Sequence, residues 1–202
     1  MNRSTHLGLW ALVAALSGCR EDAASDEPVV PEASTRNHLV WKRHHAVEQD
    51  FARALELPAK ELCTELGAFN CIRDVHLAAL GGNDPFGQGL YEPLEGPLVT
   101  TPLALDRIAL AACGTRVERD RLSAVVFTRL DLAGEAPRAD SDAFTDTVTT
   151  LYQRLLGRDP EPAEAEHIAE LLVDDAGAPV SAAAFAHLAC FTVATTAEFL
   201  YF

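Results

Sequence analysis

The hydrophobic positions in the last third of the chain recur every three or four residues, which is the spacing of one face of a helix. They predict three helices, of which the first begins at Ser141 or Asp142 and ends at Gly157. The other two are expected over 159–177 and 181–197. The predicted inner faces are formed by Phe144, Val148, Leu151, Tyr152, Leu155, Ile168, Leu171, Leu172, Phe185, Leu188, Ala189 and Val193.

The same spacing predicts helices over 37–57, 59–66 and 102–119. Thr101 and Pro102 match an N-cap residue followed by proline at the first helical position. These segments alternate with short breaks at proline and glycine, which is the organisation of a compact helical domain.

Two segments match neither the three-to-four-residue spacing of a helix nor the two-residue alternation of a strand. The stretch 71–80 is expected to be a helix or a short extended piece, and 121–132 a helix or a strand. The run Val125, Val126 and Phe127 in the second segment is compatible with either structure. The predicted fold class is all-α, mainly helical with one long loop, and a short β element near 123–130 remains open.

The stretch 81–102 has a different composition, with five glycines and four prolines, and is predicted to be one long loop. Loops of this length in a compact domain are usually functional or disordered. The loop also contains apolar residues that are expected to pack on the domain, so that a functional and a purely structural role both remain open. These residues are Phe86, Leu90, Tyr91, Leu94, Leu98 and Val99.

The first residues have the architecture of a signal peptide. A polar start that carries Arg3 precedes an apolar run over 7–16. This run is shorter than the roughly 20 apolar residues that a membrane-spanning helix needs.

The apolar run ends in the sequence Leu16-Ser17-Gly18-Cys19. This sequence resembles the lipobox of bacterial lipoproteins. The resemblance implies cleavage between Gly18 and Cys19, removal of 1–18 and attachment of lipid to Cys19. An ordinary secretory signal that is followed by a cysteine by chance is the alternative.

Membership of that class implies a lipid anchor with two or three acyl chains, which is enough for stable attachment to a membrane. Arg20 follows Cys19, and the sorting preference of the class then implies the periplasmic face of the outer membrane. The acidic stretch 19–36 is predicted to be a disordered tether. It leads to a single helical domain over 37–202, with a C-terminal helical module over 141–202.

The formal charge of the chain is −14, which makes nucleic acid a poor partner because phosphates would be repelled. Hydrophobic residues make up 49% of the chain, which is enough for a buried core. Many of them are alanines, and alanine suits close-packed helices better than sheets.

The four cysteines that remain once Cys19 is assigned to lipid suggest two disulfides in an oxidising compartment. Three pairings are possible. We favour Cys63 with Cys71, which closes a short loop, and Cys113 with Cys190, which ties the middle helix to the last one. Buried free thiols are the alternative. The chain contains neither CxxC nor CxxCH, so that a zinc ribbon and covalent haem are unsupported.

The sequence LYQRLLGRDP at 151–160, Glu164 and the sequence EFLY at 198–201 form a further pattern. It resembles a helical module at the ends of large secreted bacterial proteins of uncharacterised function, which are often linked to cytochrome c domains. The resemblance implies a helical C-terminal third and no catalytic residue.

Two arginines of this pattern, Arg154 and Arg158, lie four residues apart and therefore share a helix face. We expect them to pair with Glu164, Glu166 or Glu198 and to act as a structural clamp between helices.

Asp74 and His76, beside the loop 81–102, are the best candidates for a polar site. On a strand they would share a face and could act as a base and its orienting partner. His44 and Glu48 lie four residues apart on a predicted helix, but no third metal ligand is apparent. GxSxG and both glycine-rich phosphate motifs are absent, and no cofactor or metal is predicted.

These features lead us to expect a non-catalytic lipoprotein that acts as a scaffold or partner subunit at the cell envelope. It would be attached to the membrane through lipid and would contact an envelope protein. One alternative, implied by the C-terminal resemblance, is an accessory subunit of a periplasmic redox system. The other is a metal-dependent or hydrolytic enzyme that uses Asp74 and His76 near the loop 81–102.

Overall fold

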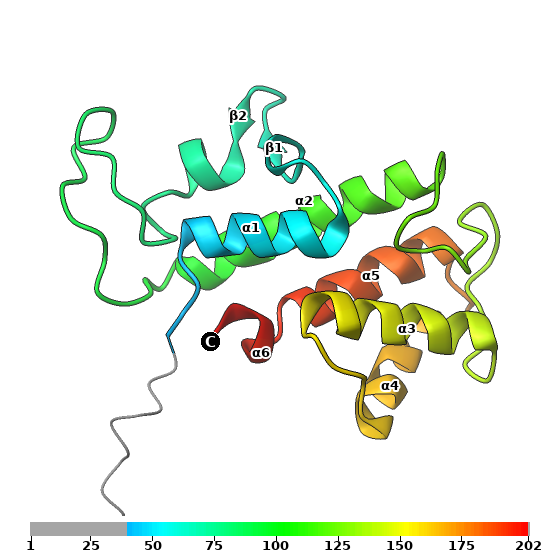
Figure 1. Ribbon diagram of the computed structural model, residues 1–202. Coiled ribbons are helices and arrows are strands. Elements are labelled where there is room, and N and C mark those ends of the chain that lie inside the picture. Colours follow the sequence, from blue (N-terminus) through cyan, green and yellow to red (C-terminus); the bar gives the residue numbers. More distant parts are fainter. Residues whose placement is uncertain (1–39, 202) are drawn as a thin grey trace, which may run out of the picture. The chain divides into compact units, whose positions relative to one another are not determined.

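The computed structural model describes residues 40–201, and over these residues the chain is about 51% helical, with one two-stranded antiparallel sheet (Figure 1). The predicted all-α class is confirmed. The predicted signal peptide, 1–18, and the predicted tether, 19–36, lie outside the described residues. In chain order the elements are α1 His44–Leu55, η1 Ala59–Glu61, β1 Thr64–Glu65, β2 Phe69–Asn70, η2 Cys71–Val75, α2 Thr101–Asp120, α3 Asp142–Leu155, α4 Pro162–Ala169, η3 Glu170–Leu172, α5 Ala182–Ala194 and α6 Ala197–Leu200.

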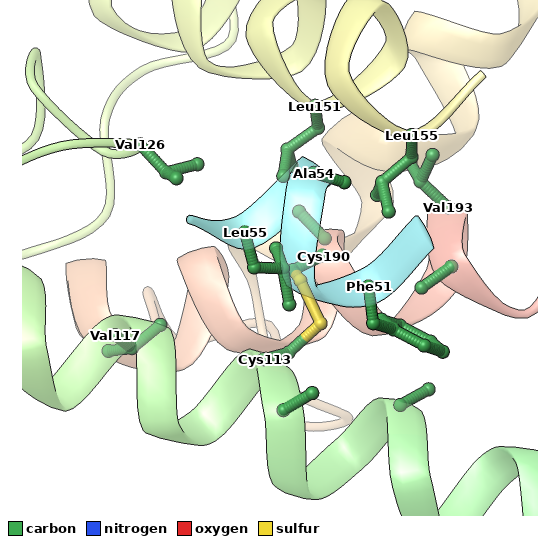
Figure 2. Packing of buried hydrophobic residues seen from close by; sticks show 14 of the residues in the cluster. Phe51, Ala54, Leu55, Cys113, Val117, Val126, Leu151, Leu155, Cys190 and Val193 are labelled. Atoms are coloured by element: carbon green, nitrogen blue, oxygen red, sulfur yellow. A yellow bond between two sulfur atoms is a disulfide. The ribbon is translucent and has the colours of Figure 1, made fainter. Parts of the chain in front are cut away.

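The core forms where α1 lies between α2 and α3, with α5 packed along both of the longer helices (Figure 1). Figure 2 shows Leu151 and Leu155 of α3 and Cys113 of α2 approaching Leu55 of α1 from opposite sides. Phe51 of α1 is fully buried in the same cluster. The helical faces that meet here are those whose hydrophobic spacing predicted helices.

Both predicted disulfides are present. Cys113 of α2 and Cys190 of α5 have Cα atoms 5.8 Å apart, and those of Cys63 and Cys71 are 5.4 Å apart. Both distances are usual for disulfides. The first bridge joins two core helices that are 77 residues apart in sequence, whereas the second closes a loop between residues separated by eight.

The segment 121–132 is neither helix nor strand, contrary to prediction, and consists of turns. The cause is the buried carboxylate of Asp120, which accepts hydrogen bonds from the backbone N–H groups of Val125, Val126 and Phe127 at 2.7–3.0 Å. With their donors used in this way, these residues cannot pair as a strand, although their side chains favour one.

The β element lies instead at 64–70, and its first strand falls within the segment 59–66, for which a helix was predicted. Thr64 pairs with Asn70 and Glu65 with Phe69, and the turn between the strands has positive φ at Leu66 (52°) and Gly67 (70°). The disulfide at the base of this hairpin brings the two strands together.

The prediction of a long loop is confirmed, since no helix or strand lies between Val75 and α2. The loop is tied to the helices at two places. Thr101 donates a hydrogen bond to the carbonyl of Ala79 at 2.6 Å and accepts one from the N–H of Leu98 at 2.8 Å. Arg43 donates to the carbonyl of Leu94 at 3.1 Å.

The remaining helices differ from prediction mainly at their ends. Ser141 caps α3 and Ser181 caps α5, each by accepting a hydrogen bond from a backbone N–H, as the sequence indicated. The last helix ends at Ala194, and Thr196 then caps the separate short helix α6. Over residues 40–201, no helix combines the length and apolar character needed to cross a bilayer.

Candidate functional site

Asp74 and His76 are not brought together. Cys71–Val75 forms a π-helix rather than a strand, and the side chain of Asn70 caps it. Asp74 accepts a hydrogen bond from the N–H of this capping residue at 2.8 Å. The Nε2 atom of His76 lies 3.0 Å from Oε1 of Glu65. The two candidates therefore serve different local structures, and the expected base with its orienting partner is not formed.

Glu65 also contacts Arg107 of α2, whose Nη2 lies 3.0 Å from the same oxygen. The cluster of Glu65, His76 and Arg107 therefore joins the hairpin and the π-helix to α2. Both cationic side chains contact one oxygen of Glu65, which is typical of a structural contact between elements.

The second polar pair, His44 and Glu48, also has a structural arrangement. Glu48 is buried and accepts two hydrogen bonds from the guanidinium of Arg73, at 2.8 and 2.7 Å. Burial, together with the neighbouring charge of His45, lowers the pKa of His44. Both carboxylate oxygens of Glu48 are occupied by Arg73, so that His44 and Glu48 are not presented together as metal ligands. Over residues 40–201 no group of three or more His, Cys, Asp or Glu residues has a geometry that could hold a metal ion.

The predicted clamp is built around Arg158. Its guanidinium donates to both oxygens of Glu164, at 2.8 and 2.6 Å, and to both oxygens of Glu198, at 2.8 and 2.6 Å. It also lies over the ring of Tyr152 at 5.3 Å. The hydrogen bonds from Arg158 lower the pKa of Glu164 to about 2 and lower that of Glu198.

Arg154 does not join this clamp, contrary to prediction. It donates to Glu56 at 2.8 Å and to the carbonyl of Ala54 at 3.3 Å, both at the C-terminal end of α1. The two arginines therefore bind α3 to different neighbours. Arg158 holds the starts of α4 and α6, whereas Arg154 holds the end of α1.

A small apolar cavity of about 130 Å³ lies where the start and the end of the described chain meet. Trp41 pairs with Tyr201 in an isolated antiparallel bridge, and Lys42 N–H donates to the carbonyl of Leu200 at 2.8 Å. The end of the long loop and the first turn of α2 complete the wall. The cavity is lined by Trp41, Pro97, Leu98, Thr101, Pro102, Leu105, Leu200 and Tyr201.

Trp41 is held firmly at this cavity. Its side chain is 7% exposed and packs so closely on Gly81 that a Cβ atom there would lie 2.8 Å from the ring, and Gly81 itself has φ +67°. Glycine is therefore required at this position. The indole Nε1 is buried and has no hydrogen-bond partner among the described residues.

Exposed apolar side chains occur in the lining and next to it in the sequence. Leu98 of the lining is 43% exposed. Val40, Val99 and Leu103, each adjacent in sequence to a lining residue, are 46%, 94% and 64% exposed, respectively. Scattered single hydrophobic residues on a surface are ordinary, but a group of them around an apolar cavity is typical of an interaction site. This cavity and its rim, which we call the Trp41 groove, are the best candidate for a functional site.

Sequence reasoning missed the Trp41 groove because its residues come from three distant parts of the chain. The only available signal was the apolar content of the loop 81–102, which indicated packing on the domain but not where. The bridge between Trp41 and Tyr201 joins single residues 160 positions apart, and no periodic sequence pattern predicts such a pairing.

In comparisons with known proteins, no family model matches the chain, and no curated protein or solved structure is significantly similar to it.

Proposed function

We propose that the protein is a lipid-anchored, extracytoplasmic lipoprotein that acts as a non-catalytic partner subunit at the cell envelope. The observation that carries the proposal is the use of its cysteines. Four of the five form the bridges Cys63–Cys71 and Cys113–Cys190, and the fifth is Cys19 of the lipobox-like sequence.

Two disulfides in a domain of this size support an oxidising compartment, because cytosolic thiols are kept reduced. The lipobox-like sequence Leu16-Ser17-Gly18-Cys19 supports export and lipid attachment. The two observations come from different parts of the chain and favour the same compartment.

The partner role is supported by the Trp41 groove. The polar candidates Asp74, His76, His44 and Glu48 are used in structural contacts, whereas the groove leaves apolar side chains exposed. An exposed apolar surface around a cavity favours contact with another molecule.

The lipid anchor is tested by mass spectrometry of the intact protein purified from its native membrane. We expect a chain that begins at Cys19, carries a diacylglyceryl group and an amide-linked acyl chain, and retains two disulfides. The Cys19→Ser variant should keep its signal peptide and leave the lipidated fraction. Detection of an unmodified Cys19 after cleavage would overturn the anchor.

The partner role is tested by replacing single residues with a photoreactive amino acid in living cells. Val99 beside the groove and Leu122 at the far end of α2 are 94% and 91% exposed, so the two positions are matched in accessibility. We expect one discrete cross-linked product from position 99 and none from position 122. Equal labelling at both positions, or none at either, would count against a partner at the groove.

A further inference from the structure

We propose that His44 acts as an acid-sensitive latch, which holds the start of the loop 81–102 against α1 while its ring is neutral and releases it when the ring takes up a proton. This inference goes beyond the proposed role as a partner subunit and does not depend on it. It follows from the close packing of the ring, from its buried, unpaired nitrogen and from the charges that face it.

The latch joins the first residue of α1 to the segment 77–82, which leads into the loop. The backbone N–H of His44 donates to the carbonyl of Leu80 at 3.0 Å. The ring packs against Gly82, where an added Cβ atom would lie 3.0 Å from Nδ1 of His44 and 2.2 Å from Cδ1 of Leu77. This spacing leaves no room for a side chain at position 82, so that the ring and the segment are in direct contact.

The surroundings of the Nδ1 atom of His44 suit a neutral ring. The atom is buried and has no hydrogen-bond partner among residues 40–201. One nitrogen of a neutral imidazole carries no proton, whereas both nitrogens of an imidazolium are donors. A buried N–H without an acceptor is costly, because the bond that it makes to water is lost and not replaced. The closed arrangement therefore disfavours the protonated ring.

The charges that face the ring act mainly in the same direction. Arg43, Arg73 of η2 and His45, whose ring centroid is 4.2 Å from that of His44, disfavour a further positive charge. Glu48 is the facing carboxylate, but both of its oxygens accept hydrogen bonds from Arg73. Burial and then the charge of His45 lower the pKa of His44, against an opposing effect of Glu48.

The other charged side chains on the adjoining stretches of chain are already paired. Lys42 pairs with Asp50 at 2.7 Å, and His76, which precedes the segment, lies 3.0 Å from Glu65. The segment itself contains no charged residue. Among the described residues, a proton on the buried ring nitrogen therefore gains no acceptor from the elements packed around it.

The release follows from the linkage between protonation and opening. In an opened chain the ring of His44 is exposed and its pKa returns to the ordinary value of 6.5, whereas in the closed chain the pKa is lower. As the pH falls below about 6.5, the open form binds the proton first, and the closed form loses stability until its own lowered pKa is reached. Opening uncovers the ring of Trp41, which packs on Gly81 of the same segment.

The test is hydrogen exchange of the full chain, with its disulfides intact, at pH 7.5 and pH 5. The rates are corrected for the intrinsic effect of pH on exchange. The N–H groups of Leu80, Gly81 and Gly82 donate to carbonyls of the preceding turns and report on opening of the segment. We expect opening to increase at least about threefold at pH 5, while the amides of α5 keep their protection.

Matched variants assign the effect to one histidine. His44→Gln removes the titrating ring, and His167→Gln makes the same change at a histidine whose side chain is 76% exposed. The increase between pH 7.5 and pH 5 should disappear in the first variant and remain in the second. Each variant is compared with itself at two pH values, so that a general loss of stability does not imitate the result.

A titration of the histidine ring resonances by NMR gives an independent measurement. The resonance that is absent from the spectrum of His44→Gln should titrate below pH 6.5 in the unmodified protein. A pKa of 6.5 or higher for this ring would overturn the inference. So would equal protection of the segment at the two pH values, or an increase in opening that persists in His44→Gln. Loss of protection in α5 together with the segment would also overturn it, because acid would then act on the whole domain.

Discussion

The helical body, formed by α1, α2, α3 and α5, and the segment 57–100, which we call the covering segment, are stabilised by different means. In the helical body, long helices bury continuous apolar faces around Phe51 and the Cys113–Cys190 bridge. The covering segment has only short elements and depends on a disulfide, ion pairs and turns. It also carries more than half of the exposed large hydrophobic side chains, namely Leu66, Phe69, Val75, Phe86, Tyr91, Leu98 and Val99.

This difference explains why exposed apolar side chains are concentrated in the covering segment. A helix buries the apolar side chains that its periodicity aligns, so that few are left for a partner. A glycine- and proline-rich segment has no such face, and its apolar residues are divided between the domain and the solvent. The body therefore provides most of the stability, whereas the covering segment leaves more of its apolar side chains exposed to solvent.

The largest loss of stability is expected on removing the Cys113–Cys190 disulfide of the helical body. Cys113→Ala together with Cys190→Ala removes a cross-link between residues 77 apart, which should lower the free energy of unfolding by about 4.5 kcal/mol in the chain-entropy model. Urea unfolding followed by circular dichroism measures this loss. A loss no larger than that of the second bridge would contradict the assignment of stability to the helical body.

The second largest loss of stability is expected on replacing Asp120, because its side chain is fully buried at the C-terminal end of α2. It pairs with Arg116 at 2.6 Å and accepts from three backbone N–H groups of the following turn. Asp120→Ala leaves the three N–H donors unpaired and removes the carboxylate partner of the buried Arg116 guanidinium, which keeps only its bonds to the carbonyls of Leu55 and Glu56. The variant should lower the free energy of unfolding by about 3–4 kcal/mol. Asp142→Ala at the exposed start of α3 is the control, and should cost far less. Similar losses in the two variants would show that the Asp120 network is not what holds the turn.

Asp120 also shows why only part of the fold could be predicted. The helices α2 and α3 and the two disulfides follow from periodicity and from an even cysteine count, which are local or countable features. The turns at 121–132 depend on a carboxylate that reaches forward by up to seven residues to backbone donors. Such a bond competes with secondary structure and leaves no periodic trace.

The candidate site was less predictable than the fold for a related reason. Asp74 and His76 were chosen because two residues on a strand share a face, but the π-helix gives them different neighbours. The Trp41 groove required the chain to bring position 41 beside positions 98 and 201, and long-range pairing of this kind is decided by packing rather than by local pattern.

The bridge of the covering segment should have a smaller and more local effect. Cys63→Ala together with Cys71→Ala opens a loop between residues eight apart, for which the same model gives a loss of about 2.5 kcal/mol at most. We expect hydrogen exchange to accelerate over 62–76 and to remain slow in α2 and α5. Uniform acceleration throughout the domain would show that the two regions unfold as one unit.

The smallest effect is expected at the Arg158 clamp, and it should depend on pH. The pKa of Glu164 is lowered to about 2 from an ordinary value of 4.5, because Arg158 stabilises its charged form. As the pH falls, the carboxylate of Glu164 is protonated in the unfolded chain before it is protonated in the folded chain. The clamp therefore contributes its stability above about pH 4.5 and loses it as the pH falls toward 2.

Arg158→Gln should therefore lower the midpoint of urea unfolding at pH 7. It should also make the decrease of this midpoint between pH 5 and pH 2.5 less steep than in the unmodified protein. Arg138→Gln is the matched control. Arg138 also makes a two-bond pair, with Asp140, but the two residues are neighbours on an exposed linker, so that the pair contributes little to folding. The urea midpoint of the Arg138→Gln variant and its dependence on pH should remain close to those of the unmodified protein.

The contradicting outcome is an Arg158→Gln midpoint that decreases with falling pH as steeply as that of the unmodified protein. It would show that Glu164 and Glu198 are not held by this arginine in solution.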